Sequence, residues 1–474
     1  MIIQGFVGPS YNMDAVTFDA QRSINLFPLV SEVQSSKSQA ALRSCPGYSL
    51  FATTSGGGPI RGAKTVASGR AFVVSGFNLE EVSAGGTTTV LGSLSTSTGR
   101  VSMAENGTEL MIVDGVSGYL YNMDTETFST ISDADFPSGA SVVTFQDGYF
   151  IVNVAASPNF ALSSLYDGTT WDVLDRSIAT SNPDNLNGLI SDNGNLWLFG
   201  DRSVEVFQNT GAAAFPFERI PGAVIQTGCA APFTVQAFDN SIAWLGVDEQ
   251  GRGVVWRANG YSAQRLSTQA IEGVIATSSD FTDSYAYVYH EQGHIFYCLQ
   301  VKGLSTTLVY DGATGAWHER NFVDVITLEE EQHRASCHFF FDQKNLIGDR
   351  ITGQIYQQSL SLFDHNGDEM HRKRVSPHQS QEKLNISFSS FELDIETGRG
   401  LVTGQGSDPQ IMMQYSDDGG RTWSNERWVS AGKIGEYKKR VRWSRCGSGR
   451  DRVWKVEYTE PTFFQINEAF LNNG

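Results

Sequence analysis

The stretch GTELMIVDGVSGYLYN, residues 107–122, contains the pattern that decides the fold of this chain. It consists of a short apolar strand, a turn rich in Asp and Gly, and a second short strand with two tyrosines near its end. This pattern is typical of an antiparallel β-hairpin, because Gly and Asp supply the backbone conformations of tight turns and aromatic residues favour strands. One such unit cannot bury both of its faces alone, so it predicts a fold in which several units pack together.

The same unit recurs between residues 51 and 363. Its other copies are GRAFVVSG (69–76), DGYFIVNV (147–154) with LYDGTTWDV (165–173), NGNLWLFGDRSVEVFQ (193–208), NSIAWLGVDEQGRGVVWR (240–257), SYAYVYHEQGHIFYCL (284–299) and HFFFDQKNLIGDRITGQIYQ (338–357). The central residues are Phe72, Met111, Phe150, Trp197, Trp244, Tyr287 and Phe339, at intervals of 39, 39, 47, 47, 43 and 52 residues. Blades of β-propellers repeat every ~40–50 residues. We therefore expect an all-β chain with a six- or seven-bladed propeller, the number depending on whether an N-terminal strand completes the last blade.

Two regions fall outside this period and divide the chain. Residues 1–50 contain INLFPL and then a polar stretch, which predicts an extended N-terminal arm before the propeller at 51–363. The segment DHNGDEMHRKRVSPHQSQEK, residues 364–383, is charged and poor in apolar residues, which predicts a polar linker. Residues 384–474 alternate between apolar and polar side chains and predict a second β domain, a small sandwich.

The alternation in this second domain predicts a β-bulge. Leu384, Ile386 and Phe388 share one face, and after Ser389–Ser390 the apolar positions slip by one residue, as an inserted bulge residue would cause. The sets that continue or repeat the alternation are Phe391, Leu393 and Ile395, then Ile411, Met413 and Tyr415, then Trp454, Val456 and Tyr458.

Composition and charge exclude several classes of protein. The chain has 474 residues, of which 40% are hydrophobic and 18% charged, so it is too apolar for a disordered protein. No apolar run reaches the ~18 residues of a transmembrane helix, and we expect neither a signal peptide nor a membrane anchor. The net charge of −18 disfavours sequence-specific binding to nucleic acid. Residues 421–455, in contrast, contain 11 Lys and Arg against three acids, which suggests two surfaces with different partners.

The cysteines and the histidines give no recognisable catalytic or metal site. The cysteines Cys45, Cys229, Cys298, Cys337 and Cys446 form no C-x-x-C pair, so we expect free, mostly buried thiols. His290-Glu291-Gln292-Gly293-His294 matches the zinc motif H-E-x-x-H, but that motif requires a helix, whereas AYVY and IFYC on either side favour a β-hairpin. Asp364, Asn366 and Asp368 resemble the start of a calcium loop that lacks its Gly and its final Glu. We predict no catalytic residue, no metal and no cofactor.

Ser416–Trp423, SDDGGRTW, matches the S-x-D-x-G-x-T-W turn called an Asp box in sialidases. Its expected role is structural: Ser416, Asp418 and Gly420 form the turn, and Trp423 packs beneath it.

The basic run near the C-terminus predicts a contact surface. If Tyr437–Trp443 is a strand, Tyr437, Val441 and Trp443 face the core. Lys438, Arg440 and Arg442 then present three cations on the opposite face, where we expect an acidic adjacent subunit, adaptor or spike to bind. Plain solvent exposure and contact with DNA are the alternatives.

Five segments together resemble the tail nozzle, or hub, proteins of short-tailed bacteriophages, also called packaged-DNA stabilisation proteins. They are SINLFP (23–28), LRSCPG (42–47), GRVSMAENG (99–107), RSVEVFQNTG (202–211) and the run FELDIETG to VEYTEP within 391–461.

The resemblance implies a structural virion protein of the tail, assembled in the bacterial cytoplasm, and not an enzyme. It implies a homohexamer that continues the DNA channel below the portal and its adaptor protein, retains packaged DNA and serves genome ejection. Tailspikes or fibres and a tail needle or plug are the other implied partners, and double-stranded DNA passes without sequence-specific binding. The alternatives are a propeller glycoside hydrolase of the sialidase kind, supported by the Asp box, and a cytoplasmic propeller scaffold.

Overall fold

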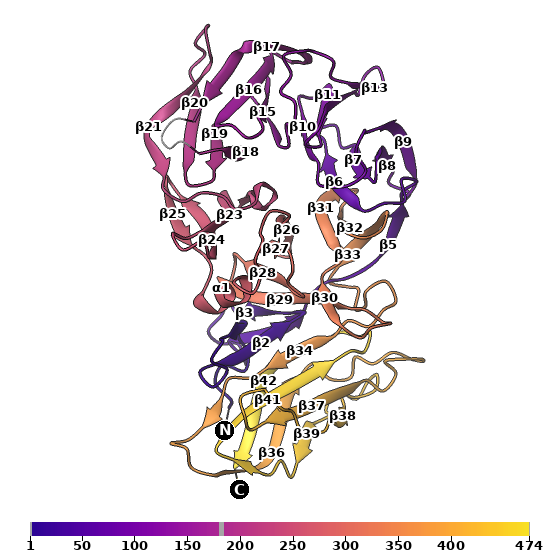
Figure 1. The fold of residues 1–474 in the computed structure, drawn as a ribbon. Coiled ribbons are helices and arrows are strands. Elements are labelled where there is room, and N and C mark those ends of the chain that lie inside the picture. The colour runs from indigo at the N-terminus through magenta and orange to yellow at the C-terminus, as the bar shows by residue number, and fades with distance from the viewer. Residues whose placement is uncertain (1, 180–183, 474) are drawn as a thin grey trace.

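A computed structural model describes residues 2–179 and 184–473 and shows a β-propeller above a β-sandwich (Figure 1). The prediction of an all-β propeller with a C-terminal sandwich is confirmed. Both termini lie at the sandwich, so the chain enters and leaves the propeller from the same side. Within the described residues, no helix is long and apolar enough to cross a membrane.

The described residues form seven four-stranded antiparallel blades, which resolves the predicted number. Blades one to three are β6 (Ile60–Thr65), β7 (Ala71–Ser75), β8 (Asn78–Val82) and β9 (Thr88–Ser93); β10 (Ser102–Glu105), β11 (Glu109–Val113), β12 (Gly118–Asn122) and β13 (Thr127–Thr130); and β14 (Val143–Gln146), β15 (Tyr149–Asn153), β16 (Asn159–Ser164) and β17 (Asp167–Ile178). Blades four and five are β18 (Leu186–Asp192), β19 (Asn195–Gly200), β20 (Val204–Asn209) and β21 (Phe217–Ile225); and β22 (Gln236–Phe238), β23 (Ser241–Val247), β24 (Gly253–Asn259) and β25 (Ser262–Arg265).

Blade seven closes the ring with a strand from the start of the chain. Blade six is β26 (Tyr285–Glu291), β27 (His294–Gln300), β28 (Thr307–Asp311) and β29 (Ala316–Val323). Blade seven is β31 (Ala335–Phe341), β32 (Lys344–Asp349), β33 (Gln354–Ser359) and β5 (Gly47–Thr53). Because β5 pairs with β33, the two ends of the propeller are hydrogen-bonded into one sheet. Two short helices, η1 (Pro232–Thr234) and α1 (Gln269–Ile275, capped by Thr268), flank blade five.

The continuous apolar runs of the blades arise because both faces of each sheet are covered. In β11, Leu110 and Ile112 pack against blade one, whereas Met111 packs against blade three. Successive residues of a strand point to opposite faces, so a strand between two blades needs apolar residues at successive positions. The first strand of each blade lines a central cavity of about 420 Å³.

The sandwich has two sheets, one of which is continuous with blade six. From β29 the first sheet continues through β2 (Ala20–Ile24), β34 (Arg372–Val375), β41 (Asp451–Tyr458), β37 (Gln410–Ser416) and β38 (Arg427–Ser430). Strands β1 (Tyr11–Asn12), β30 (Glu330–Gln332) and β35 (Gln379–Ser380) pair at its sides. The second sheet is β3 (Leu26–Val30), β4 (Ala40–Ser44), β42 (Gln465–Asn473), β36 (Ile386–Ile395) and β39 (Val441–Ser444), with β40 (Ser448–Gly449) on β36.

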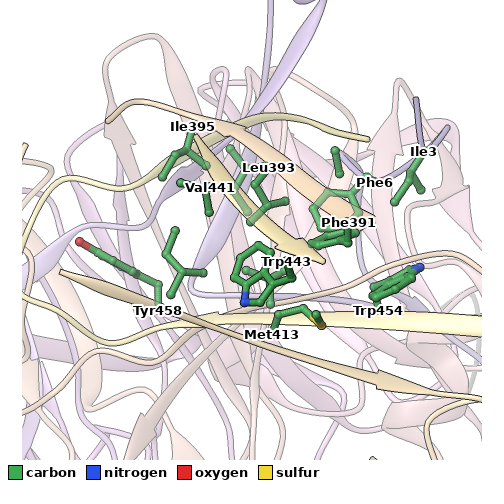
Figure 2. Packing of buried hydrophobic residues seen from close by; sticks show 14 of the residues in the cluster. Ile3, Phe6, Phe391, Leu393, Ile395, Met413, Val441, Trp443, Trp454 and Tyr458 are labelled. Carbon is green, nitrogen blue, oxygen red and sulfur yellow. The ribbon is translucent and has the colours of Figure 1, made fainter. Parts of the chain in front are cut away.

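The core of the sandwich is aromatic and includes residues from the start of the chain. Ile3 and Phe6 pack with Phe391, Trp443 and Trp454 between the two sheets (Figure 2). The bulge predicted in β36 is present, since its register with β42 shifts between Phe388 and Ser390. Leu384 does not share the buried face, however, because it lies before the strand begins and is exposed.

Two segments differ from their description as an arm and a linker. The described residues of the predicted arm, 2–50, supply β1 to β4 and the start of β5 to sheets of both domains. Residues 364–383 contain β34, which pairs with β2 and β41 in the middle of a sheet. Met370, Arg372 and Arg374 are buried there, because the arginines bond to oxygens of the protein instead of water. The low apolar content of residues 364–383 therefore did not predict their exposure to solvent correctly.

Candidate functional site

The junction of propeller and sandwich, which we call the waist, is held by paired charges. The Arg22 side chain in β2 donates to Glu319 of β29 with an Nε–Oε1 distance of 3.1 Å. Lys373 in β34 lies 2.7 Å from Glu330 of β30. Glu319 is buried, and the neighbouring Arg22 guanidinium is its compensating charge. These pairs cross from blade six to the strands of the sandwich and hold the continuous sheet in register.

Arg374 fastens the N-terminal segment to the waist. Its guanidinium is fully buried and is surrounded by oxygens instead of a carboxylate. The six acceptors are the carbonyls of Gly5, Phe6, Pro9 and Arg22, the Ser23 hydroxyl and the Gln21 side-chain oxygen, at 2.5–3.3 Å. Burial lowers the pKa of Arg374 to about 9, so the group remains charged at neutral pH.

Arg372 and Arg452 are also fully buried, Arg372 among neutral oxygens and Arg452 against a carboxylate. Arg372 donates to the Ser44 hydroxyl at 2.5 Å and to the carbonyl of Glu460 at 3.0 Å. Arg452 pairs with Asp417 at 2.7 Å, and its guanidinium lies 3.9 Å from the ring centroid of Tyr415. Arg372 and Arg374 thus join the waist to neighbouring segments by directional bonds, which favours one fixed orientation of the two domains, whereas Arg452 bonds within the sandwich.

The basic residues predicted to share a strand do not do so. Strand β39 begins at Val441, and residues 435–440 form turns that include a left-handed Gly435 at φ 86°. Val441 and Trp443 are buried as predicted, whereas Tyr437 is 71% exposed and does not belong to the core. The chain turns at Ile434–Gly435 and again at Tyr437–Lys438, so its pairing with β36 begins only at Val441.

Lys438, Arg440 and Arg442 are nevertheless all exposed. Arg440 forms a two-pronged pair with Glu392 of β36 at 2.6 and 2.8 Å, and Arg442 lies opposite Glu392 in the sheet. Lys438 and Arg442 form no ion pair with a described residue. The surface is therefore mixed in charge around Arg440, and Lys438 and Arg442 are the cations available to a partner.

The turn of Ser416–Trp423 joins β37 to the segment before β38. The Ser416 hydroxyl donates to Asp418 Oδ1 at 2.6 Å and accepts from the Gly420 amide at 2.8 Å. Asp418 also accepts from the Thr422 amide at 2.9 Å. These bonds, that from Ser416 above all, hold the pKa of Asp418 well below its usual range. Since the unfolded value is ~3.9, the turn stabilises the fold above that pH, and the contribution is lost as the pH falls through the folded pKa.

Trp423 is half-buried and not enclosed beneath the turn. Its ring lies 4.6 Å from the Lys455 ammonium, in a cation–π contact. We expect Trp423→Ala to lower the free energy of unfolding by about 1–2 kcal/mol, less than the ~3–5 kcal/mol of a fully buried tryptophan. Chemical denaturation measures this. Unchanged stability together with the loss of a glycan-binding activity would instead make the turn a binding site.

The H-E-x-x-H segment forms the β-hairpin that its flanks predicted. Strand β26 ends at Glu291, Gln292 and Gly293 make the turn, and β27 begins at His294. His294 Nδ1 lies 2.8 Å from Asp311 of blade six. All five cysteines are free, and four of them are buried, with Cys337 partly so.

The comparisons with known proteins cover both parts of the fold. The family model described as Bacteriophage P22 Gp10, beta-propeller, matches residues 4–361, and the one described as Bacteriophage P22 Gp10, beta-sandwich, matches residues 371–473. The chain belongs to the P22 Gp10 family. It is a structural protein of a phage tail and a component of the virion, as the resemblance implied. No curated protein matches the sequence.

Among solved structures, this P22 Gp10 family chain is similar to two proteins at low identity and with TM-scores below 0.5. The extracellular domain of a putative hybrid two component system from B. thetaiotaomicron has a TM-score of 0.46 and 9% identity, over 73% of this chain and 43% of that one. The WD40 beta propeller domain of Doa1 has a TM-score of 0.40 and 12% identity, over 66% and 96%. The chain thus spans less than half the length of the bacterial domain.

The buried arginines of the waist are the residues that the sequence did not reveal. In and beside β34, Met370, Arg372, Arg374 and Ser376 alternate with less buried residues, and this period of two was the available signal. It was obscured because arginine is normally exposed, so HRKRV reads as a solvated run.

Proposed function

We propose that this chain forms the hexameric nozzle of a short phage tail. In this role it continues the DNA channel below the portal and adaptor, retains packaged DNA and releases it at ejection. The observation that carries the proposal is the match of both family models, in order, over 4–361 and 371–473. A tailspike or fibre and a tail needle or plug are the further proposed partners.

The charge of the propeller suits a wall along which DNA slides. Residues 371–473 contain 16 Lys and Arg and 13 Asp and Glu, so the remaining residues carry a net charge of −21. An acidic wall repels phosphate and prevents DNA from adhering. The cavity on the propeller axis, at about 420 Å³, is too small for a duplex whose major groove alone is ~12 Å wide. The proposed channel therefore lies between subunits and not through a propeller.

The hydrogen-bonded waist suits a part that must retain packaged DNA. Blade six and the sandwich share one sheet, and buried arginines fasten the N-terminal segment across the junction. A force on one domain is then transmitted to the other through hydrogen bonds within a sheet, not through a flexible connection.

The direct test is assembly of the purified chain. Mass photometry and negative-stain microscopy should show six-membered rings, and the rings should bind to tail-less particles that carry portal and adaptor. Protein that stays monomeric at every concentration, and fails to restore infectivity to such particles, would exclude the nozzle role.

The exposed cations supply a prediction within this role. Reversing Lys438, Arg440 and Arg442 to Glu should leave the monomer folded and weaken assembly or attachment at least tenfold, and added salt should weaken the wild type similarly. The matched control reverses Lys383 and Arg450, two exposed cations outside this segment. Normal rings and normal attachment in the triple variant would show that these cations only face solvent.

A further inference from the structure

The loop between β29 and β30, residues 324–329, presents apolar side chains to water at the waist. Val325 is 59% exposed, Ile326 88% and Leu328 77%. Ile326 is the most exposed of the large hydrophobic residues in the part of the chain that the structure describes. Three such residues on one loop form a patch of the kind that marks contact surfaces. We call residues 324–329 the apolar loop.

The apolar loop is held in one conformation by its own hydrogen bonds. Asp324 Oδ1 accepts from the amides of Ile326 and Thr327, both at 2.8 Å. The Leu328 amide donates to the Asp324 carbonyl at 2.8 Å, although Leu328 adopts a left-handed φ of 58°. A leucine rarely adopts this conformation, so the fold maintains a strained backbone that keeps apolar side chains in water. Strain of this kind is typical of a preorganised binding element.

The surroundings of the apolar loop are acidic. Asp324 and Glu329 form its base, and neither makes an ion pair with a described residue. Glu330 and Glu331, which follow, are instead paired with Lys373 and Arg350 at 2.7 Å. The loop therefore combines an apolar centre with two carboxylates at its border, which is the composition of an interface core and rim.

A second surface of the same chain has the opposite charge. At one end of the sandwich, the loops 396–409 and 431–440 are joined by a bond from the Gly435 amide to the Gly398 carbonyl. They expose Val402 at 79%, Ile434 at 57% and Tyr437 at 71%. We call these two loops the sandwich tip.

The cations of the sandwich tip are exposed beside these apolar residues. They are Arg399, Lys433, Lys438, Lys439 and Arg440. The acids of the tip are Glu396, Asp408 and Glu436, so its five cations outnumber its acids by two. Lys433 lies 4.0 Å from Asp408, and Arg440 is paired with Glu392 of β36, which leaves Arg399, Lys438 and Lys439 without an ion pair to a described residue. The tip is thus apolar with a basic border, complementary to the apolar loop.

We propose that the apolar loop of one subunit docks on the sandwich tip of the next copy of this chain. The inference rests on the proposed ring, because a cyclic ring of identical chains requires two different, complementary surfaces on each subunit. Ile326 and Leu328 insert against Val402, Ile434 and Tyr437. Asp324 and Glu329 face the lysines, and these charges select the partner surface and its orientation.

Disulfide cross-linking between two singly substituted proteins tests the contact. Ile326→Cys and Val402→Cys proteins, with tags of different size, are mixed and oxidised. The native cysteines are buried or partly buried and are common to every sample. The mixed dimer should exceed both homodimers, and the dimer from a Leu174→Cys and Val402→Cys mixture, at least tenfold. Leu174 is a matched control, since it is 80% exposed but lies on blade three. Equal yields would overturn the proposal.

Assembly of the Ile326→Ser, Leu328→Ser variant gives a second measure. Its rings should form only at a concentration at least tenfold above that of the wild type, whereas Leu174→Ser should match the wild type. Both variants should melt normally, because the substituted side chains are exposed. Wild-type rings with no preferred cross-link and no effect of the double substitution would overturn this contact and leave the nozzle role intact. A preferred cross-link without any rings would support the proposed contact and contradict the proposed ring.

Discussion

Replacing Arg374 by Leu should remove at least about 4 kcal/mol from the free energy of unfolding of the sandwich. The substitution deletes six hydrogen bonds in a fully buried site, and their acceptors, mostly backbone carbonyls, are left without a donor. An orphaned buried polar group costs ~1–3 kcal/mol, and Leu cannot offset several of them. Denaturant titration followed by circular dichroism measures the loss.

The same substitution should release the start of the chain. The amides of Ile3 and Ser10 donate to Ala469 of the sandwich and Trp317 of blade six, so the segment between them bridges the two domains. In Arg374→Leu, hydrogen exchange of both amides should be faster than in the wild type. Arg450→Leu is the control, because Arg450 is exposed and should change stability by less than ~0.5 kcal/mol. Equal stability of the two variants would contradict the role of Arg374.

Trp454→Ala should cost about 3–5 kcal/mol, the range for a large aromatic residue in a packed core. The Trp454 ring is fully buried and stacks on Phe391 at a centroid distance of 4.8 Å. The ring centroids of Phe388 and Tyr415 lie 5.6 and 5.8 Å from that of Trp454. Figure 2 labels Trp454 and Phe391. Removing the ring leaves a cavity between the two sheets, which those neighbours can fill only partly. Chemical denaturation compares the variant with the wild type.

Two further tryptophan variants separate packing from other causes. Trp428→Ala, on β38, removes a side chain that is 54% exposed and should cost less than about 1.5 kcal/mol. Trp454→Phe retains an aromatic ring and deletes an indole N–H that has no hydrogen-bond partner, so it should cost less than Trp454→Ala. If Trp454→Ala and Trp428→Ala were equally stable, the core would not depend on this ring.

Local patterns predicted the hairpins well. All seven anchor residues, from Phe72 to Phe339, lie in strands of successive blades. The bulge in β36 could also be predicted, because the alternation of apolar and polar residues shifts by one position after Ser389. In each case the information lies within a few residues, where side-chain period and turn chemistry act.

The basic segment shows where such reasoning fails. Alternation from Tyr437 to Trp443 predicted one strand, but Gly432 and Gly435 take left-handed conformations and the strand begins only at Val441. Whether a glycine turns the chain depends on what the rest of the fold offers as a partner. For Val441 that partner is Leu393 of β36, almost fifty residues earlier in the chain.

The sequence alone determined the repeated structural unit, a β-hairpin that recurs at the spacing of propeller blades. It also determined the acidic net charge and the alternation of apolar residues that form the core of the sandwich. Only the tertiary structure decided the number of blades, since β5 joins β33 across about three hundred residues. It also decided that the arginines of HRKRV are buried, because oxygens between Gly5 and Ser23 accept the hydrogen bonds of Arg374 in place of water. Hydrophobic period and turn type are properties of neighbouring residues, whereas ring closure and the solvation of a buried charge depend on atoms that folding alone brings together.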